Sequence, residues 1–331
     1  MAAAASPFLK GCSEPSAARR GWPRYAADML TSLPPAVKAA AQSHLGSRVT
    51  EVSRLSGGDI SAAFRVVAGH GQFVVKVRPE QADHPALFHA EALGLHLLGQ
   101  QLVGEARAVV VPQVVGYGLA AGGTGVGQLA YLVMNFLEPA PETPQAQEAL
   151  GRGLAALHRT AGPQFGGTPD NFVGFLPQKN PPTPTAAEFF WAARLAPQLK
   201  RAQDHLSAGD IHNFEALRER LPGLIPPEAP ALVHGDLWRG NMLFTALGPA
   251  LIDPAATYSH REVDLSLMRL FGGVSERVFA AYAEAFPPAE GWEQRADLWN
   301  LYPLLAHLNM FGDRYLGRLQ AALHAASNMI I

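Results

Sequence analysis

The stretch Leu232-Val-His-Gly-Asp-Leu-Trp-Arg-Gly-Asn241 decides how this chain folds. Within it, Asp236 follows a histidine by two positions, and Asn241 follows Asp236 by five. An apolar stretch then leads to a second aspartate, Asp253. Loops that catalyse phosphoryl transfer have this order and spacing, because the reaction needs a base to orient the attacking hydroxyl and oxygen ligands for magnesium. The pattern predicts a two-lobed kinase fold with Asp236 as the catalytic base and with Asn241 and Asp253 as magnesium ligands.

A His-Gly-Asp tripeptide by itself is commonly no more than a turn. The longer pattern, in which the asparagine and the second aspartate follow at these distances, is much rarer and favours the functional interpretation. In that interpretation His234 is structural, because it fixes the loop by hydrogen bonds and transfers no proton.

A lysine stands where an apolar strand is expected. Lys76 lies within Val74-Val-Lys-Val77, where a charge is costly unless it is paired. Glu91 lies three residues after Phe88 and four before Leu95, which places a carboxylate on the apolar face of a helix. We predict that Lys76 and Glu91 form an ion pair beside the phosphates of ATP. The alternative is that Lys76 lies on an exposed edge strand and Glu91 at the rim of its helix.

Two further segments are expected to contact the nucleotide. Gly57 and Gly58 lie in a turn between two strands, where backbone N–H groups can cover phosphates, although any hairpin favours such glycines. Asn135, Phe136 and Leu137 end the last strand of the first lobe, and in a two-lobed kinase this segment pairs with adenine. The end of an ordinary core strand is equally compatible with these three residues.

The composition is that of a folded protein with two lobes. The chain has 331 residues, of which 48% are hydrophobic and 16% charged, and its formal net charge is −2. This near-neutral charge argues against general binding to nucleic acid or to a membrane surface. The single cysteine, Cys12, excludes an intramolecular disulfide, so we expect a cytoplasmic protein. Residues 1–35 are expected to form a poorly ordered extension, with an organelle transit peptide as the alternative.

Periodicity predicts an α+β fold with a small antiparallel sheet and one helix over residues 36–138, followed by a larger helical lobe over residues 139–331. The Pro-rich segment Pro139–Pro144 is the expected boundary, and Phe165–Pro184 is expected to be a loop over the cleft. The expected strands are Val49–Leu55, Ala62–Val67, Phe73–Val77, Val109–Tyr117 and Leu129–Phe136. The expected helices are Pro35–Gly46, Pro85–Gln100, Gln145–Thr160, Ala186–Leu206, Asn213–Leu221, Val263–Phe271, Ser275–Phe286 and Glu293–Gly312.

Three residues near the motif are candidates for contact with the substrate or for support of the loop. Trp238 would suit a platform for a sugar ring, with a generic core tryptophan as the rival interpretation. His260 could face the substrate. Asp264, at the head of a helix, is expected to brace the catalytic loop. The remaining histidines show no metal-ligand spacing with cysteine, so no zinc site is predicted.

Together these motifs resemble the fructosamine kinase family, also called ketosamine-3-kinases. The resemblance is carried by His234-Gly-Asp-Leu-Trp-Arg-Gly-Asn241, Ile252-Asp-Pro-Ala255, Tyr258-Ser-His-Arg-Glu262, Phe271-Gly-Gly273 and Gly174-Phe-Leu-Pro-Gln178. Aminoglycoside and choline kinases share His-x-Asp-x4-Asn but generally lack the Leu-Trp and Asp-Pro-Ala elements. Three positions depart from the family pattern. They are Asp59, where many members carry a cysteine that can link dimers, Arg239, where serine is common, and Ser259, where glycine is common.

The resemblance implies a protein-kinase-like fold of the aminoglycoside phosphotransferase type, with ATP and Mg²⁺ as cofactors. It also implies a ketoamine substrate, a sugar joined to an amine by glycation, either on a protein or as a small molecule. Phosphate on the third carbon of the sugar leaves readily beside the ketone, so the adduct can fall apart and free the amine. The chain would then act in protein deglycation, as a monomer or a weak homodimer.

Two other functions remain open. The first is a different small-molecule kinase, acting on an aminoglycoside, choline or homoserine. A cationic antibiotic would need an acidic pocket, and no acidic cluster is evident in Phe165–Arg194. The second is a catalytically inactive nucleotide-binding regulator, against which stands the presence of all the expected kinase positions.

Overall fold

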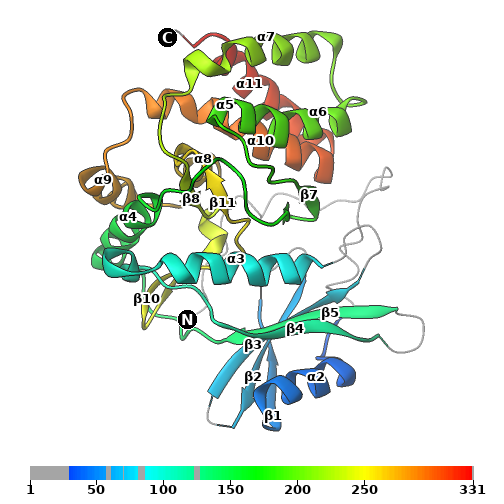
Figure 1. Ribbon diagram of the computed structural model, residues 1–331. Coiled ribbons are helices and arrows are strands. Elements are labelled where there is room, and N and C mark those ends of the chain that lie inside the picture. Colours follow the sequence, from blue (N-terminus) through cyan, green and yellow to red (C-terminus); the bar gives the residue numbers. More distant parts are fainter. Residues whose placement is uncertain (1–29, 57–60, 70, 81–85, 123–126, 330–331) are drawn as a thin grey trace.

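A five-stranded antiparallel sheet forms the first part of the computed structural model (Figure 1). The structure describes residues 30–56, 61–69, 71–80, 86–122 and 127–329. The strands are β1 (Val49–Arg54), β2 (Ala62–Ala68), β3 (Gly71–Pro79), β4 (Val114–Ala121) and β5 (Gln128–Asn135), and they lie in the order β1-β2-β3-β5-β4. Four of the five predicted strands are confirmed with small shifts at their ends.

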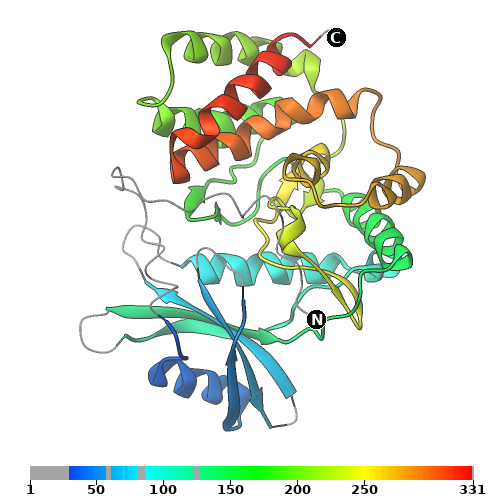
Figure 2. The same ribbon diagram turned by 180° about the vertical axis from the view of Figure 1, so that it is seen from behind.

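Two helices cover the two faces of this sheet, α2 (Pro35–Leu45) on one face and α3 (Leu87–Gln101) on the other (Figures 1 and 2). Side chains along a strand point alternately to its two faces. In β3, Val75 and Val77 join the core beneath α2. Lys76, which lies between them, therefore points to the other face, toward α3.

The strand predicted at Val109–Tyr117 begins later than expected. β4 starts at Val114, because Pro112 has no N–H group to donate to a neighbouring strand. The first valine of the run, Val109, is almost fully buried in a core of the helical part. The apolar run thus reflects contact with the second lobe as well as strand formation.

Helices make up most of the second part of the chain and enclose two cores. One core joins α5, α6, α7, α10 and α11, and the other joins α4, α8 and α9 to the end of α3. The bounds are α4 (Pro144–His158), α5 (Ala186–Phe189), a π-helical segment (Phe190–Leu195), α6 (Ala196–Ala202), α7 (Ala208–Leu224), α8 (Glu262–Leu270), α9 (Glu276–Ala285), α10 (Trp292–Phe311) and α11 (Leu316–Ser327). Among the described residues, no helix is both long enough and apolar enough to cross a membrane. The expected bilobal α+β fold class is confirmed.

Two features of the helical part differ from the expectation. The segment expected to be a loop contains a short hairpin, β6 (Asn171–Val173) and β7 (Leu176–Gln178). Helix α11 was not predicted, although its buried residues recur at helical spacing. Those buried residues are Leu319, Ala322, Leu323 and Ala326.

The catalytic motif lies on turns between short strands. β8 (Ala231–Val233) pairs with β11 (Thr257–Ser259), and β9 (Met242–Thr245) pairs with β10 (Gly248–Leu251). The His-Gly-Asp turn follows β8, a 3₁₀ turn at Arg239–Asn241 precedes β9, and Asp-Pro-Ala follows β10. The two strand pairs therefore bring both halves of the motif together.

We expect Gly151→Ala to lower the free energy of unfolding by about 1–3 kcal/mol. A Cβ atom at Gly151 in α4 would lie 2.3 Å from the carbonyl oxygen of Val278 in α9, so the two helices would have to separate. Gly317→Ala in α11 is a matched control, because a Cβ there has no heavy atom within 4 Å. Urea denaturation measures both variants. Equal or higher stability of the first variant would contradict close packing of α4 on α9, because alanine alone favours a helix.

Candidate active site

A buried lysine joins the two lobes. Nζ of Lys76 donates to both carboxylate oxygens of Glu91, each at 2.8 Å, and to Oδ1 of Asp253 at 2.9 Å. The ion pair predicted between Lys76 and Glu91 is therefore present, and both side chains are buried. Burial alone would lower the pKa of Lys76, but the charges of Asp253 and Glu91 raise it above its ordinary value. The ammonium thus stays charged.

Asp253 is the member of this cluster that a ligand can reach, because its side chain is 40% exposed whereas that of Lys76 is 10% exposed. Its backbone has a φ of 56°, in the left-handed region that non-glycine residues rarely adopt. The neighbouring Pro254 packs closely on α3, since a Cβ at Gly94 would lie 3.1 Å from its ring. The surrounding contacts therefore hold Asp253 in this unusual conformation.

Asp236 and Asn241 lie together within the catalytic loop. Nδ2 of Asn241 donates to the carbonyl oxygen of Asp236 at 2.8 Å and to its Oδ2 at 3.1 Å. Loss of solvation, reinforced by the charge of Asp253, raises the pKa of Asp236 to about 7. Such a carboxylate is a better proton acceptor than an ordinary aspartate. The hydrogen bonds engage the nitrogen of Asn241 and leave its amide oxygen as a potential ligand for a cation.

Asp264 braces the loop from beneath. It is fully buried in the first turn of α8, where Oδ2 accepts the N–H of His234 at 2.7 Å and Oδ1 accepts the N–H of Gly235 at 2.9 Å. Nε2 of His158, at the end of α4, lies 3.3 Å from Oδ2. Burial alone would raise the pKa of Asp264, but His158 and the backbone donors lower it, so the carboxylate stays ionised. The predicted supporting role of Asp264 is confirmed.

His234 and Gly235 fix the shape of the loop. Nε2 of His234 donates to the carbonyl oxygen of Ile252 at 2.9 Å, and Nδ1 accepts the N–H of Asp236 at 3.2 Å. These two bonds assign a neutral ring, and burial lowers the pKa of His234. The hydrogen bonds by which His234 was predicted to fix the loop are therefore present. Gly235 has a φ of 80°, and a Cβ there would lie 2.3 Å from the carbonyl oxygen of Ala255, so only glycine fits.

The segments expected to contact ATP are only partly described. Gly57 and Gly58 lie outside the described residues. The N–H groups of Asn135 and Phe136 donate to backbone carbonyls of adjacent segments, both at 3.0 Å, and Leu137 is buried. These two N–H groups are therefore engaged within the protein. That this segment pairs with adenine stays a prediction. The pairing would have to use backbone groups other than these two N–H groups.

The two candidate substrate residues differ in their surroundings. Trp238 is 36% exposed, so it is not a core residue, and a Cβ at Gly240 would lie 2.2 Å from its ring, which places the indole directly over that glycine. His260 is fully buried and stacks on Trp299 with ring centroids 5.0 Å apart. The structure therefore does not support the interpretation of His260 as a substrate contact, because its ring has no exposed surface.

A row of buried hydrogen bonds that the sequence did not predict reaches the site from the β6–β7 hairpin. The hydroxyl of Tyr302 in α10 donates to the side chain of Gln178, Nε2 of Gln178 donates to Oδ1 of Asn171 at 2.8 Å, and Nδ2 of Asn171 donates to the carbonyl oxygen of Ala256 at 3.1 Å. This row of hydrogen bonds ties α10 and the hairpin to the segment that follows Asp253. Its sequence signal is weak, since Asn171 and Gln178 each stand beside a charged residue, Asp170 and Lys179, where an exposed side chain is expected.

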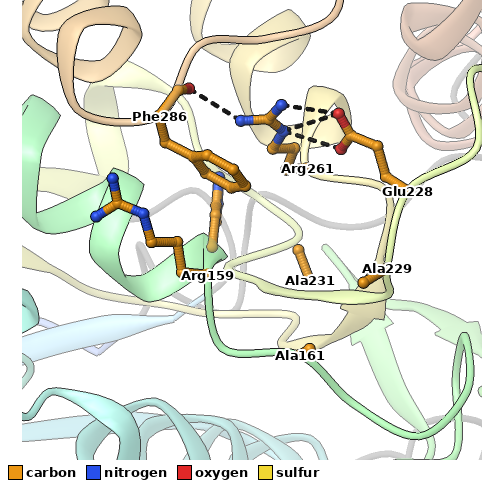
Figure 3. Close-up of a pocket in the computed structure, with 8 residues that line it drawn as sticks. Arg159, Ala161, Glu228, Ala229, Ala231, Arg261 and Phe286 are labelled. Carbon is orange, nitrogen blue, oxygen red and sulfur yellow. Dashed lines mark hydrogen bonds and ion pairs between the residues drawn. The ribbon is translucent and has the colours of Figure 1, made fainter.

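A separate pocket of about 240 Å³ lies near the end of α4 (Figure 3). Its lining includes Arg159, Arg261 and Phe286, and Arg261 donates to Glu228 at 2.7 Å and to the carbonyl oxygen of Phe286 at 2.9 Å. The charge of Arg261 is therefore matched within the protein. None of the residues predicted for catalysis lines this pocket.

Known proteins are similar to this chain over most of its length. A probable ketoamine kinase of Thermus thermophilus is 40% identical over 272 residues, which cover 82% of this chain and 92% of that protein. A chloroplastic protein-ribulosamine 3-kinase of Arabidopsis thaliana is 33% identical over 278 residues, which cover 81% of this chain and 80% of that protein. Similarity of this extent involves both lobes.

Solved structures share the fold. The crystal structure of a "putative fructosamine-3-kinase" from Thermobifida fusca is 37% identical and has a TM-score of 0.78, covering 88% of this chain and 99% of that one. An aminoglycoside phosphotransferase bound to ADP and hygromycin B is 16% identical and has a TM-score of 0.61. The match covers 89% of this chain and 100% of that one, and at this identity it supports the fold alone. The expected protein-kinase-like architecture is confirmed.

The family model described as fructosamine kinase matches residues 34–328. The resemblance inferred from the sequence motifs is thereby confirmed, and so is the expected class of enzyme. This chain belongs to the fructosamine kinase family and is a kinase that transfers phosphate to a hydroxyl group.

Proposed function

We propose that this chain uses ATP to phosphorylate the 3-hydroxyl of the sugar in ketoamines, with ribulosamines and fructosamines as its candidate substrates. One observation carries the proposal, namely that the ammonium of Lys76 contacts both Glu91 of the first lobe and Asp253 of the second. This contact assembles the charged groups of phosphoryl transfer beside Asp236. We place the boundary between the lobes at Pro139–Pro144.

In the proposed reaction each charged residue has one task. Asp236 accepts the proton of the sugar hydroxyl while that oxygen forms a bond to the γ-phosphorus. The bond between this phosphorus and the bridging oxygen breaks, and ADP leaves with the electron pair. Lys76 binds the phosphates, and Glu91 keeps the ammonium in position. Catalysis is then mostly positioning and charge neutralisation.

The donor set fits a magnesium ion shared with the nucleotide. Mg²⁺ prefers oxygen ligands and is commonly held by one or two carboxylates together with substrate phosphates. Asp253 offers an exposed carboxylate, and Asn241 offers an amide oxygen because its nitrogen is engaged by Asp236. Within the described part of the chain, no group of three His, Cys, Asp or Glu side chains could hold a metal. Magnesium would neutralise charge on the transferring phosphate.

The substrate class rests on the relatives and on Trp238. The relatives are named for ketoamines and for protein ribulosamines. Trp238 offers an exposed ring two residues beyond the proposed base, and an indole face suits the apolar side of a sugar. The product would carry phosphate next to the ketone, and loss of this phosphate would release the amine. The proposed biological result is deglycation of proteins or of small amines.

Production of ADP in the presence of Mg²⁺ tests this function, with ribulosyl-lysine, fructosyl-lysine and kanamycin as acceptors. We expect turnover of the ketoamines, with the higher kcat/KM on ribulosyl-lysine, and phosphorus NMR should locate the phosphate on the third carbon. Turnover of kanamycin alone would remove the ketoamine assignment. Binding of ATP without turnover of any acceptor would favour an inactive regulator.

We expect Asp236→Asn to lower kcat by about 10²–10⁴-fold while the Kd for ATP stays within about twofold. The amide keeps the shape of the side chain but cannot accept the proton. Single-turnover kinetics and calorimetric titration of ATP measure the two quantities. Asp204→Asn, on the exposed surface, is the control and should behave as the wild type. Undiminished kcat in the first variant would refute Asp236 as the base.

Glu91→Gln should lower kcat/KM for ATP by at least about tenfold, because the buried ammonium of Lys76 loses one of its two charged partners. Initial rates at varied ATP concentration give this value. His96→Gln, on the exposed side of the same helix, controls for general effects on α3. If both variants kept wild-type kcat/KM, the ion pair would be structural only.

A further inference from the structure

A chain of aromatic rings leads away from Trp238 along one side of the helical lobe. The ring centroids are 6.3 Å apart for Trp238 and Phe271, 5.1 Å for Phe271 and His307, 5.5 Å for His307 and Phe311, and 4.9 Å for His307 and Tyr315. We call these five residues the aromatic strip. It connects the catalytic loop to the corner between α10 and α11.

The aromatic strip is open to solvent at both ends. Trp238 is 36% exposed, and Phe311 is 39% exposed. The other three rings, Phe271, His307 and Tyr315, are half-buried and connect these two exposed ends. Large aromatic side chains are usually buried, and a row of rings that reaches solvent commonly marks a binding site. Since the strip begins at the residue that we propose to contact the sugar, a group attached to that sugar can continue onto it.

Two exposed arginines lie over the strip. The guanidinium of Arg314 lies 5.0 Å from the ring centroid of Phe311 and 5.2 Å from that of Tyr315. The guanidinium of Arg318 lies 5.6 Å from the ring of Phe271, and its Nη2 donates to the carbonyl at the end of α8 at 2.9 Å. These contacts hold both charges against the aromatic surface.

Among the described residues, no carboxylate matches the positive charge of these arginines. In the part of the chain that the structure describes, no carboxylate forms an ion pair with Arg314 or Arg318, whereas Arg239 and Arg269 pair with glutamates. The adjacent carboxylate, that of Asp313, is 2.6 Å from Nδ1 of His205. The strip therefore carries two positive charges that remain available to an anion.

The central histidine of the strip adds no charge of its own. Burial lowers the pKa of His307, and the nearby charges of Arg314 and Arg318 lower it further. Its Nδ1 donates to the carbonyl oxygen of Pro303 at 2.7 Å. The neutral ring thus serves as packing surface between the two arginines.

We propose that the aromatic strip, with Arg314 and Arg318, binds the amine-carrying part of the substrate and favours ketoamines that have a carboxylate close to the glycated nitrogen. This inference rests on the proposed function, because a ketoamine joins its sugar and its carrier at one nitrogen. With the sugar at Trp238, the carrier lies on the strip. A carboxylate matches the planar guanidinium in shape and charge, and the rings pack on the hydrocarbon of the carrier.

Two sources provide this chemistry. One is a free amino acid that is glycated on its α-amine, which keeps its α-carboxylate two bonds from the nitrogen. The other is a glycated protein amine with an acidic residue beside it. The recognised group is the same in both, so matched substrates can separate the sources.

The first experiment compares ribulosyl-glycine with ribulosyl-glycinamide, which differ only in the carboxylate. We expect kcat/KM to be roughly three- to tenfold higher for the carboxylate, mainly through KM, because an exposed ion pair contributes a modest binding free energy. The ratio of kcat/KM for ribulosyl-glycine to kcat/KM for ribulosyl-glycinamide should fall as the NaCl concentration is raised, since salt screens exposed charges. Ribulosylated peptides with Lys-Asp and Lys-Asn then test the protein source.

The second experiment removes the charges. The double variant Arg314→Gln/Arg318→Gln should bring the ratio close to one, and Arg314→Glu/Arg318→Glu should reverse the preference. Arg218→Gln is the matched control, because Arg218 is also exposed and also lies over an aromatic ring, away from the strip. Arg218 belongs to α7, and its guanidinium lies 5.3 Å from the ring centroid of Trp191 in the π-helical segment. Its ratio should equal that of the wild type. Circular-dichroism melting verifies that each variant is folded.

The outcomes separate the two proposals. A wild-type enzyme that turns over both glycine derivatives equally well overturns the role of the aromatic strip and leaves the kinase function intact. A preference that survives loss of both arginines also overturns it, because the carboxylate is then recognised elsewhere. If the wild type phosphorylates neither derivative nor ribulosyl-lysine, the proposed function itself is wrong, and this inference falls with it.

Discussion

The contact of one ammonium with two carboxylates is the interaction on which the rest of this structure depends. Lys76 would be costly in an apolar strand, and Glu91 would be costly on the apolar face of α3. Asp253 adopts a left-handed backbone conformation that costs about 1–3 kcal/mol for residues other than glycine. Each feature is unfavourable alone and is tolerated because the other two are present. The sheet lobe and the segment that carries Asp253 are therefore positioned by the same charges to which we assign the chemistry.

A second charge organises the loop that carries the proposed base. The buried carboxylate of Asp264 accepts two backbone N–H groups, and His158 supports it from α4. His158 is held in turn by the hydroxyl of Tyr282 in α9, at 2.9 Å. The loop is thus anchored to three helices before any substrate arrives. Such preorganisation lets charged groups act without reorienting during the reaction.

The groups that we propose to bind phosphate and those that we propose to select the substrate belong to different elements. The first set comes from β3, α3 and the turns between short strands, whereas the aromatic strip comes mainly from the ends of α8, α10 and α11. Trp238 links the two sets, because it lies within the catalytic loop and is also the first ring of the aromatic strip. Under these two proposals, the choice of amine carrier can change through surface residues while the proposed phosphoryl-transfer residues stay in place.

The sequence by itself determined four of the five strands of the first lobe, the catalytic loop and the pairing of Lys76 with Glu91. Each of these leaves a local signal, such as a fixed spacing or a charge in an apolar run. It did not determine that His260 is buried, that the segment before α5 forms a hairpin tied to Tyr302, or that Trp238 begins a row of rings reaching Tyr315. Only the tertiary structure decided these points, because burial and contact between residues far apart in the chain depend on how whole helices pack, and no local pattern records that packing.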